Sequence, residues 1–432
     1  MNIAVFQEKD KEPEEKKDSV SEEKEKKDSL KKEGSENEEF INHLKISPLL
    51  NKIRLFLKNP LGFILLFFLL FFMNSFWEKF GVPQTVFLLI SSFILSLVFT
   101  PSMLELSRIL GIVDRSDSPR KIHFGEVGKL GGLAVALAFA GAIILSENSF
   151  PYKYKIVMVS GAIIAFVGLL DDIFGIPAKL RLLAQFFLAI WVIDNGISLR
   201  LFPVGEEWGK GLNEVLTLIW IIGFTNAYNF IDGLDGLASG LGIIIALSSS
   251  IISLLNGSPE VFLLSLPLCG ALLGFLFFNF FPAWIFLGDI GAQFCGFVLA
   301  SLTADVAWAS RGEYWKAFLL PAMIMWFLLF DMIQITIFRI KYGFVKSFSD
   351  WIAFTGKDHI HHRLMFLLKS HRGAVLFIYL SSVFLSFLAF ILAGLKLNYI
   401  LGFSLAFLFF ISSVLLLFSL DSKTRDKAFS IT

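Results

Sequence analysis

Twelve apolar runs of about 16–25 residues recur along the chain. A run of this length is enough to cross the hydrocarbon core of a bilayer as one helix. Charged residues make up only 17% of the chain, whereas a soluble domain carries about 25%. The runs lie near residues 60–78, 82–100, 130–147, 156–171, 180–197, 213–231, 236–256, 260–281, 288–309, 315–339, 374–394 and 398–420. The sequence therefore predicts an all-α, polytopic integral membrane protein with about 11–12 transmembrane helices.

The segments outside the runs predict how the chain is divided. Residues 1–45 are rich in Lys and Glu and nearly free of apolar side chains, so we expect a disordered, charged cytoplasmic tail. An extra N-terminal membrane segment follows at 46–81, then a membrane domain at 82–420 and a cytoplasmic C-terminal tail at 421–432. We expect membrane lipids as partners, and the net charge of +1 gives no reason to expect nucleic acid.

The Lys and Arg residues between the runs predict the orientation in the membrane. With the N-terminus in the cytoplasm and twelve spans, and with the residues before the first run left uncounted, sixteen of them lie on the inner side and seven on the outer side. Both termini are therefore predicted to be cytoplasmic.

Four polar motifs stand at the ends of apolar runs or between them. They are Asp171–Asp172 in GLLDDIFG, Asn226 to Asp235 in NAYNFIDGLDG, Asp289 in FLGDIGA and His359 to Arg363 in HIHHR. A carboxylate at bilayer depth is costly and usually functional, although one at the end of a span is also explained by solvation. Because all four motifs face the cytoplasm under this topology, we expect one active site at that face.

The second motif repeats every three residues, at Asn226, Asn229, Asp232 and Asp235. Residues three apart share a helix face, so the row predicts one polar stripe on an apolar helix. A glycine follows each aspartate, which lets a ligand approach the backbone closely. A helix C-terminus with glycine caps is the structural alternative, but it does not explain two Asn and two Asp in register.

So many acids around one site would repel one another unless a cation lies among them. Oxygen donors without thiolates favour Mg²⁺, with Mn²⁺ as an alternative, over Zn²⁺. His359, His361 and His362 are too close in sequence to share one metal on a regular helix, and with Arg363 they suggest a phosphate clamp. Zinc binding and a plain loop remain the alternatives there. The residues thus predict a Mg²⁺-dependent membrane enzyme that acts on phosphate groups, one of them on a lipid.

The order of the motifs resembles the polyprenyl-phosphate N-acetylhexosamine-1-phosphate transferases. The segments NAYNFIDGLDGLA, NFFPAWIFLGDIG and DHIHHRL carry the resemblance, which covers about residues 82–420. The HIHHR loop is similar to that of the branch that transfers GlcNAc-1-phosphate to undecaprenyl phosphate. Two departures stand out: Gly128 precedes Lys129 in the KLGG segment, and WIAFTGK lengthens the loop before Asp358.

The resemblance implies a reaction and a location. N-acetylhexosamine-1-phosphate, taken here as GlcNAc-1-phosphate, would pass from a UDP-sugar to undecaprenyl phosphate with release of UMP. This step would start O-antigen, teichoic acid or another cell-envelope polysaccharide at the bacterial inner membrane, with a homodimer as the implied assembly. The alternatives are the sister branch, the phospho-MurNAc-pentapeptide transferases, and a non-enzymatic transporter with carboxylates along an ion path.

The resemblance also implies roles for the residues. Asp289 would bind Mg²⁺, and Asp171 and Asp172 would bind the metal or take a proton from the lipid phosphate. Asp232 and Asp235 would be further acids of the catalytic site. The implied substrate-binding residues are Lys121, His123, Asn226, Asn229, Asn279, Arg339, His359, His361, His362 and Arg363.

Overall fold

The structure is a computed structural model, and one part of the chain is described. The described residues are 83–115, 126–146, 150–203, 205–308, 313–346, 358–395, 400–405, 407–413 and 415. All of them belong to one compact unit, Pro60–Thr432. The predicted tails at 1–45 and 421–432, the segment at 46–81, and both Lys121 and His123 lie outside the described residues.

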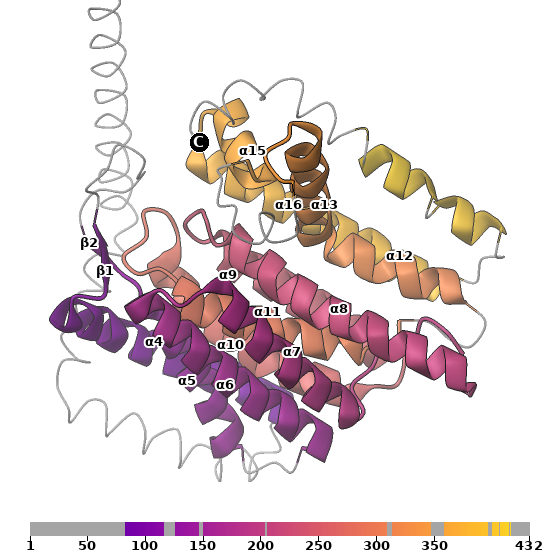
Figure 1. Ribbon diagram of the computed structural model, residues 1–432. Helices are drawn as coiled ribbons and strands as arrows, with labels where there is room; N and C mark the ends of the chain where they lie inside the picture. Colours follow the sequence, from indigo (N-terminus) through magenta and orange to yellow (C-terminus); the bar gives the residue numbers. More distant parts are fainter. Residues whose placement is uncertain are drawn as a thin grey trace, which may run out of the picture. The chain divides into compact units, whose positions relative to one another are not determined.

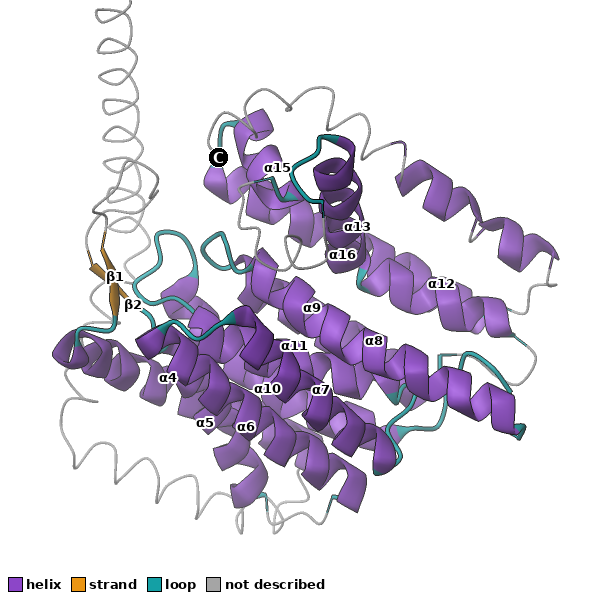
Figure 2. Cartoon of the chain, viewed as in Figure 1, coloured by secondary structure: helices purple, strands orange, loops and turns teal. Residues whose placement is uncertain are grey.

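Helices account for nearly all of the regular structure in this part of the chain (Figure 1). They are α4 (Gln84–Leu110), α5 (Gly131–Leu145), α6 (Tyr152–Phe174), α7 (Ala178–Asp194), α8 (Glu207–Ile231), α9 (Leu237–Leu255), α10 (Pro259–Asn279), α11 (Gly288–Ala304), α12 (Tyr314–Ile324), α13 (Trp326–Lys341), α15 (Ile360–Leu368) and α16 (His371–Gly394). A further helix runs over Ile400–Ser413. Figure 2 shows the exception, in which strand β1 (Val113–Arg115) pairs antiparallel with β2 (Glu126–Gly128). The prediction of an all-α membrane protein is confirmed.

Six of the described helices are long and apolar enough to cross a membrane, namely α4, α6, α8, α9, α10 and α16. The helices α5, α7 and α11 occupy predicted runs but have only 15, 17 and 17 residues. The run at 315–339 is not one straight span, because α12 and α13 meet at Met325 with a bend of 86°. Pro321 lies one turn before the bend and has no N–H to donate within the helix.

The bend was not predicted, because nothing in the apolar run interrupts its hydrophobicity. The chain is a multi-pass membrane protein, but the described part contains fewer straight spans than the twelve apolar runs suggested.

Helix α11 lies at the centre of the bundle, where it packs against α5, α6 and α8. Every residue from Ile290 to Ala304 is buried. Glycines allow the close approach: a Cβ on Gly132 would lie 2.0 Å from the backbone nitrogen of Gly291, and one on Gly168 would lie 2.6 Å from the carbonyl oxygen of Asp289. Small residues let membrane helices meet in this way. The packing of α5 and α6 therefore places Asp289, at the start of α11.

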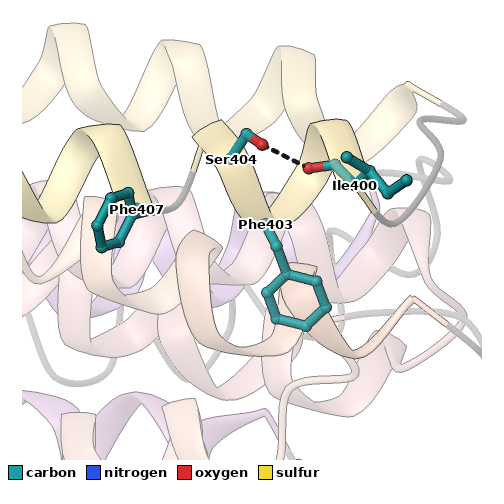
Figure 3. A pocket seen from close by; sticks show the side chains of 4 residues that line it. All are labelled: Ile400, Phe403, Ser404 and Phe407. Atoms are coloured by element: carbon teal, nitrogen blue, oxygen red, sulfur yellow. Dashed lines mark hydrogen bonds between the residues drawn. The ribbon is translucent and has the colours of Figure 1, made fainter.

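The last helix, Ile400–Ser413, has a shallow pocket on its surface (Figure 3). Its lining is Ile400, Phe403, Ser404 and Phe407, all from this one helix. The Ser404 hydroxyl donates to the carbonyl of Ile400 at 2.7 Å, so its polar atom is used within the helix. The pocket therefore offers apolar contacts, of the kind that acyl chains make, and lies apart from the polar motifs.

Candidate active site

The amino end of α11 gathers acids from three elements. The carboxylate of Asp172, from α6, accepts a hydrogen bond from the backbone N–H of Ile290 at 3.1 Å. The carboxylate of Asp232, just after α8, accepts one from the backbone N–H of Gly288. Asp289 stands between these two donors. The carboxylates of Asp172 and Asp232 thus hold the first turn of α11, and this turn carries the third carboxylate, that of Asp289.

Gly288 leaves room for this arrangement. Its φ is +69°, a conformation that L side chains rarely adopt. A Cβ at this position would lie 2.8 Å from Oδ2 of Asp172 and 2.5 Å from the carbonyl oxygen of Lys129. Any larger residue would therefore push Asp172 away from α11.

Arg181 on α7 supplies a positive charge within this acidic cluster. Its guanidinium forms an ion pair with Asp171 and lies 3.4 Å from Oδ1 of Asp289. None of the predicted motifs includes Arg181, because it lies within an apolar run. A lone arginine in such a run was the available signal, since an unpaired charge there is costly.

The acids influence one another strongly. Removal of water from around Asp232, together with the negative charges of Asp289, Asp172 and Asp235, raises the pKa of Asp232 to about 8. A carboxyl group with that pKa is largely protonated at neutral pH. A cation bound beside it would favour the ionised form, so proton and cation compete at this position.

The donor set suits a hard divalent cation. Within the described residues, no three His, Cys, Asp or Glu side chains converge on one point that would hold a metal. Mg²⁺ commonly needs only one or two protein carboxylates, because water and substrate phosphates complete its shell. Asp289 has the more open carboxylate, with its side chain 33% exposed, and Asp171 is its neighbour across Arg181. The residues present therefore fit Mg²⁺ held jointly with a phosphate-bearing substrate.

The polar stripe predicted from Asn226 to Asp235 is correct only for its first half. Helix α8 ends at Ile231, so Asp232 caps the helix and Asp235 lies in the following loop. Gly236, which has a φ of +79°, immediately precedes the next helix, α9. The side-chain amide of Asn226 donates to Gln185 Oε1 at 2.6 Å, and Asn229 is half-buried one turn further on.

Two of the predicted site residues join loops in this structure. The Asp235 carboxylate accepts a hydrogen bond from the Ala283 N–H at 2.9 Å. The Asn279 side-chain oxygen accepts from the Gly236 N–H at 3.2 Å and from the Ser239 hydroxyl at 2.8 Å. These bonds tie the α8–α9 loop to the segment before α11. Both side chains therefore hold the loops that carry the other acids.

The histidine motif is anchored on α13. Arg339 makes two 2.8 Å hydrogen bonds to the carboxylate of Asp358, and the Asp331 carboxylate lies 2.6 Å from Nδ1 of His359. The Arg363 Nε–H donates to the carbonyl of Asp358 at 2.8 Å. All of these side chains are buried. Arg339, predicted to bind substrate, here binds Asp358.

His361 is fully buried, whereas the other two histidines of the motif, His359 and His362, are 6% and 9% exposed. Its ring lies 4.3 Å from that of His362, and a Cβ on Gly233 would lie 2.6 Å from its Nε2. Burial and the neighbouring His362, His359 and His371 hold the pKa of His361 well below its usual range, so its ring is neutral. In this structure His361 and His362 of α15 both lie beside Gly233 of the α8–α9 loop.

Three of the four sequence motifs therefore meet along one loop, and Asp172 of the fourth motif reaches them through its bond to α11. The segment Asp232–Gly236 touches α11 at Gly288 and the histidine motif at His361. Its Asp235 N–H also donates to Nε2 of His371 at 3.2 Å, the first residue of α16. The acidic cluster and the histidine motif therefore both border the segment Asp232–Gly236.

Known sequences match the part of the chain that forms this region. The sequence model of glycosyl transferase family 4 matches residues 154–307, from α6 to just beyond α11. A protein of Bacillus subtilis strain 168, named probable undecaprenyl-phosphate N-acetylglucosaminyl 1-phosphate transferase, is 34% identical over 307 residues, which are 70% of this chain and 83% of the relative. This chain belongs to glycosyl transferase family 4. The resemblance noted in the motifs is confirmed.

Other members of glycosyl transferase family 4 are also similar. The decaprenyl-phosphate N-acetylglucosaminephosphotransferase of Mycobacterium tuberculosis is 34% identical over 294 residues, 60% of this chain and 71% of the relative. The phospho-N-acetylmuramoyl-pentapeptide-transferase of Streptococcus pyogenes is 34% identical over 206 residues, 42% of this chain and 61% of the relative. The relatives named for GlcNAc-phosphate transfer thus match over a longer part of this chain.

Proposed function

We propose that the chain transfers GlcNAc-1-phosphate from UDP-GlcNAc to undecaprenyl phosphate and releases UMP. The observation that carries the proposal is the convergence of Asp171, Asp172 and Asp232 around Asp289 at the amino end of α11, with Arg181 among them. Acids without thiolates, bordered by a cation, suit a reaction between two phosphate groups. The names of the Bacillus subtilis and Mycobacterium tuberculosis relatives support GlcNAc as the sugar.

The reaction exchanges one phosphoanhydride for another. An oxygen of the lipid phosphate attacks the sugar-bearing phosphorus of UDP-GlcNAc, the new P–O bond forms, and the bond to UMP breaks. The main barrier is charge, because a phosphate anion must approach a diphosphate. Mg²⁺ bound at Asp289, with Asp171 or Asp172 beside it, would supply charge stabilisation on the diphosphate.

Side chains of the protein itself compensate charge and orient the phosphate groups. Arg181 lies between Asp171 and Asp289, where it offsets negative charge at the point of attack. One oxygen of Asp172 accepts a hydrogen bond from the Ile290 N–H, which fixes this carboxylate at the amino end of α11. The second pKa of a phosphate is about 6, so the lipid phosphate is largely ionised at neutral pH and Asp171 and Asp172 serve to orient it. His359 and Arg363 lie across the loop and would hold the diphosphate.

We place this site at the cytoplasmic face of the bacterial inner membrane. The asymmetry of Lys and Arg between the apolar runs supports that orientation, with both termini inside. The product would then start a cell-envelope polysaccharide. The homodimer implied by the family resemblance stays a prediction.

A transfer assay tests the proposal. The purified protein in detergent receives undecaprenyl phosphate, Mg²⁺ and either UDP-GlcNAc, UDP-GalNAc or UDP-MurNAc-pentapeptide, and UMP release is followed with an EDTA control. We expect UMP from UDP-GlcNAc and none after EDTA. Release only from the pentapeptide nucleotide would move the chain to the branch of the Streptococcus pyogenes relative. Release from no donor by folded protein would contradict the proposal.

A further inference from the structure

Asp331 is a buried acid that no sequence motif singled out. It lies on α13 and is 1% exposed. Its Oδ2 is 2.6 Å from Nδ1 of His359, and its Oδ1 accepts a hydrogen bond from the Ile360 N–H at 2.7 Å. One carboxylate thus holds both the side chain before α15 and the first backbone amide of that helix.

The neighbouring pair on α13 has the opposite polarity. Arg339 binds Asp358 through two hydrogen bonds of 2.8 Å. The acid Asp331 and the base Arg339 on α13 therefore bind the base His359 and the acid Asp358, which are consecutive residues of the next segment. A slip by one residue in one direction would place Asp358 against Asp331, and a slip in the other direction would place His359 against Arg339. Either like-charge contact is unfavourable in a buried setting, so the two pairs together define the register of the histidine motif on α13.

The arrangement also decides which atom of His359 is available. Because Nδ1 faces Asp331, only Nε2 is left to meet a ligand. The ring stacks against that of His361 at 5.5 Å and lies 5.5 Å from that of Phe230, the residue after Asn229. His359 is therefore held beside the end of α8, which carries the polar row that leads to the acidic cluster.

We propose that Asp331 is a positioning residue of the donor site, which fixes the ring orientation and the positive charge of His359 so that its Nε2–H donates to a phosphate oxygen of the nucleotide sugar. The inference rests on the proposed function and deepens it. Asp331 touches no substrate itself. Its effect on the reaction passes entirely through His359.

Electrostatics favour a charged ring at this position. The groups that face His359 are Asp331 and Arg339 on α13, and Asp358 and His361 on its own segment. Burial alone would lower the pKa of His359, but the charge and hydrogen bond of Asp331, together with Asp358, raise it above its usual value. The positive charge is consequently kept to higher pH than in a free histidine and is lost as the pH rises through the raised pKa.

The test measures the KM for UDP-GlcNAc from pH 5.5 to 9 in the wild type and in Asp331→Asn. Asparagine still accepts from the Ile360 N–H but carries no charge. Asp305→Asn is the matched control: Asp305 is also buried and bound to Lys153 at 2.6 Å, but it follows the opposite end of α11 from Asp289. Seventeen helical residues separate those two ends by about 25 Å.

We expect Asp331→Asn to raise the KM about tenfold at pH 8 and to change kcat less than threefold. The difference in KM between Asp331→Asn and the wild type should shrink toward pH 5.5, where the imidazole of His359 is protonated even without the charge of Asp331. Asp305→Asn should change the KM equally little at every pH. In a His359→Gln background, Asp331→Asn should have no further effect on the KM, which separates positioning from general stability.

Several results would overturn the inference. One is a wild-type KM profile in Asp331→Asn, and another is an undiminished effect in the His359→Gln background. If Asp331→Asn does not fold, the KM for UDP-GlcNAc is measured across the same pH range in Asp331→Glu and His359→Gln. A KM in His359→Gln that varies with pH as in the wild type counts against the inference.

A wild type without turnover would contradict the proposed function, but the inference then has its own test. Thermal stabilisation by UDP at pH 6 and pH 8 should be kept at both values in the wild type and lost at pH 8 in Asp331→Asn. Equal stabilisation of the two proteins, or none in either, would contradict it.

Discussion

Nη1 of Arg181 lies 3.4 Å from Oδ1 of Asp289, although 108 positions separate the two residues in the chain. The same guanidinium pairs with Asp171, so a single cation from α7 serves acids from α6 and α11. Arg181 therefore places positive charge between these two carboxylates. The site is assembled by helix packing, because its charged groups come from distant parts of the chain.

Asp289→Ala should abolish transfer while the protein still folds. The carboxylate of Asp289 is more open than that of Asp171, with side chains 33% and 8% exposed, and the proposed metal would depend on Asp289 most. We expect UMP release to fall at least about 100-fold. Elution as a single peak in detergent shows that the variant folds, and normal turnover would contradict the metal assignment.

Arg181→Gln should make the protein more dependent on a divalent cation. Without the guanidinium, Asp171 and Asp289 have lost the positive charge that lies between them. In EDTA we expect Tm to fall by about 2–4 °C, and added Mg²⁺ to restore more of Tm than it adds in the wild type. Arg181→Lys keeps the charge and is the control. A Mg²⁺ response equal to that of the wild type would mean that Arg181 and the metal do not share these acids.

Arg339→Leu should destabilise the protein in a pH-dependent way. It leaves the carboxylate of Asp358 buried and unpaired, which costs about 3–5 kcal/mol. In the wild type, burial raises the pKa of Asp358, but the hydrogen bonds and charge of Arg339 outweigh burial and lower it below its usual value. That pair stabilises the fold above the unfolded pKa of about 3.9 and loses its effect as the pH falls through the lower, folded pKa.

In Arg339→Leu the pKa of Asp358 is raised by burial instead. Protonation then relieves the unpaired charge, so the stability gap to the wild type should narrow as the pH falls from 8 to 5. Thermal unfolding in detergent across this range measures the gap. Arg339→Lys should lose less stability, and a gap that does not vary with pH would show that the carboxylate of Asp358 is paired in another way.

Gly132→Val should disrupt the bundle at the site. A Cβ at Gly132 would lie 2.0 Å from the Gly291 nitrogen, so α5 and α11 would have to separate. We expect a loss of about 1–3 kcal/mol or more, measured as a lower Tm, together with lost transfer. Gly223→Ala on α8 is the matched control, because a Cβ there has no atom within 4 Å, and alanine in a helix should be neutral or stabilising. Equal effects of both changes would argue against close packing of α5 on α11.

The helix boundaries show the limit of local patterns. The row at Asn226, Asn229, Asp232 and Asp235 predicted one helical stripe, but α8 ends at Ile231. The glycines after both aspartates were visible in the sequence, yet whether they end a helix depends on the loop's hydrogen bonds. Those bonds come from Asn279 and Ala283, which are 43 and 48 positions away from their partners.

The sequence by itself determined that the chain is a helical membrane protein, where its apolar segments lie and which motifs carry its chemistry. Hydrophobic length and motif order are local properties, so they can be read without a fold. Only the tertiary structure decided that Asp172 and Asp232 hold the start of α11 and that α12 and α13 bend by 86°. It also decided that Arg181 pairs with Asp171 and Asp289 and that Asp331 contacts His359. Each of these features joins segments far apart in the chain. The partners of a buried charged residue are set by helix packing, so they cannot be read from the sequence around it.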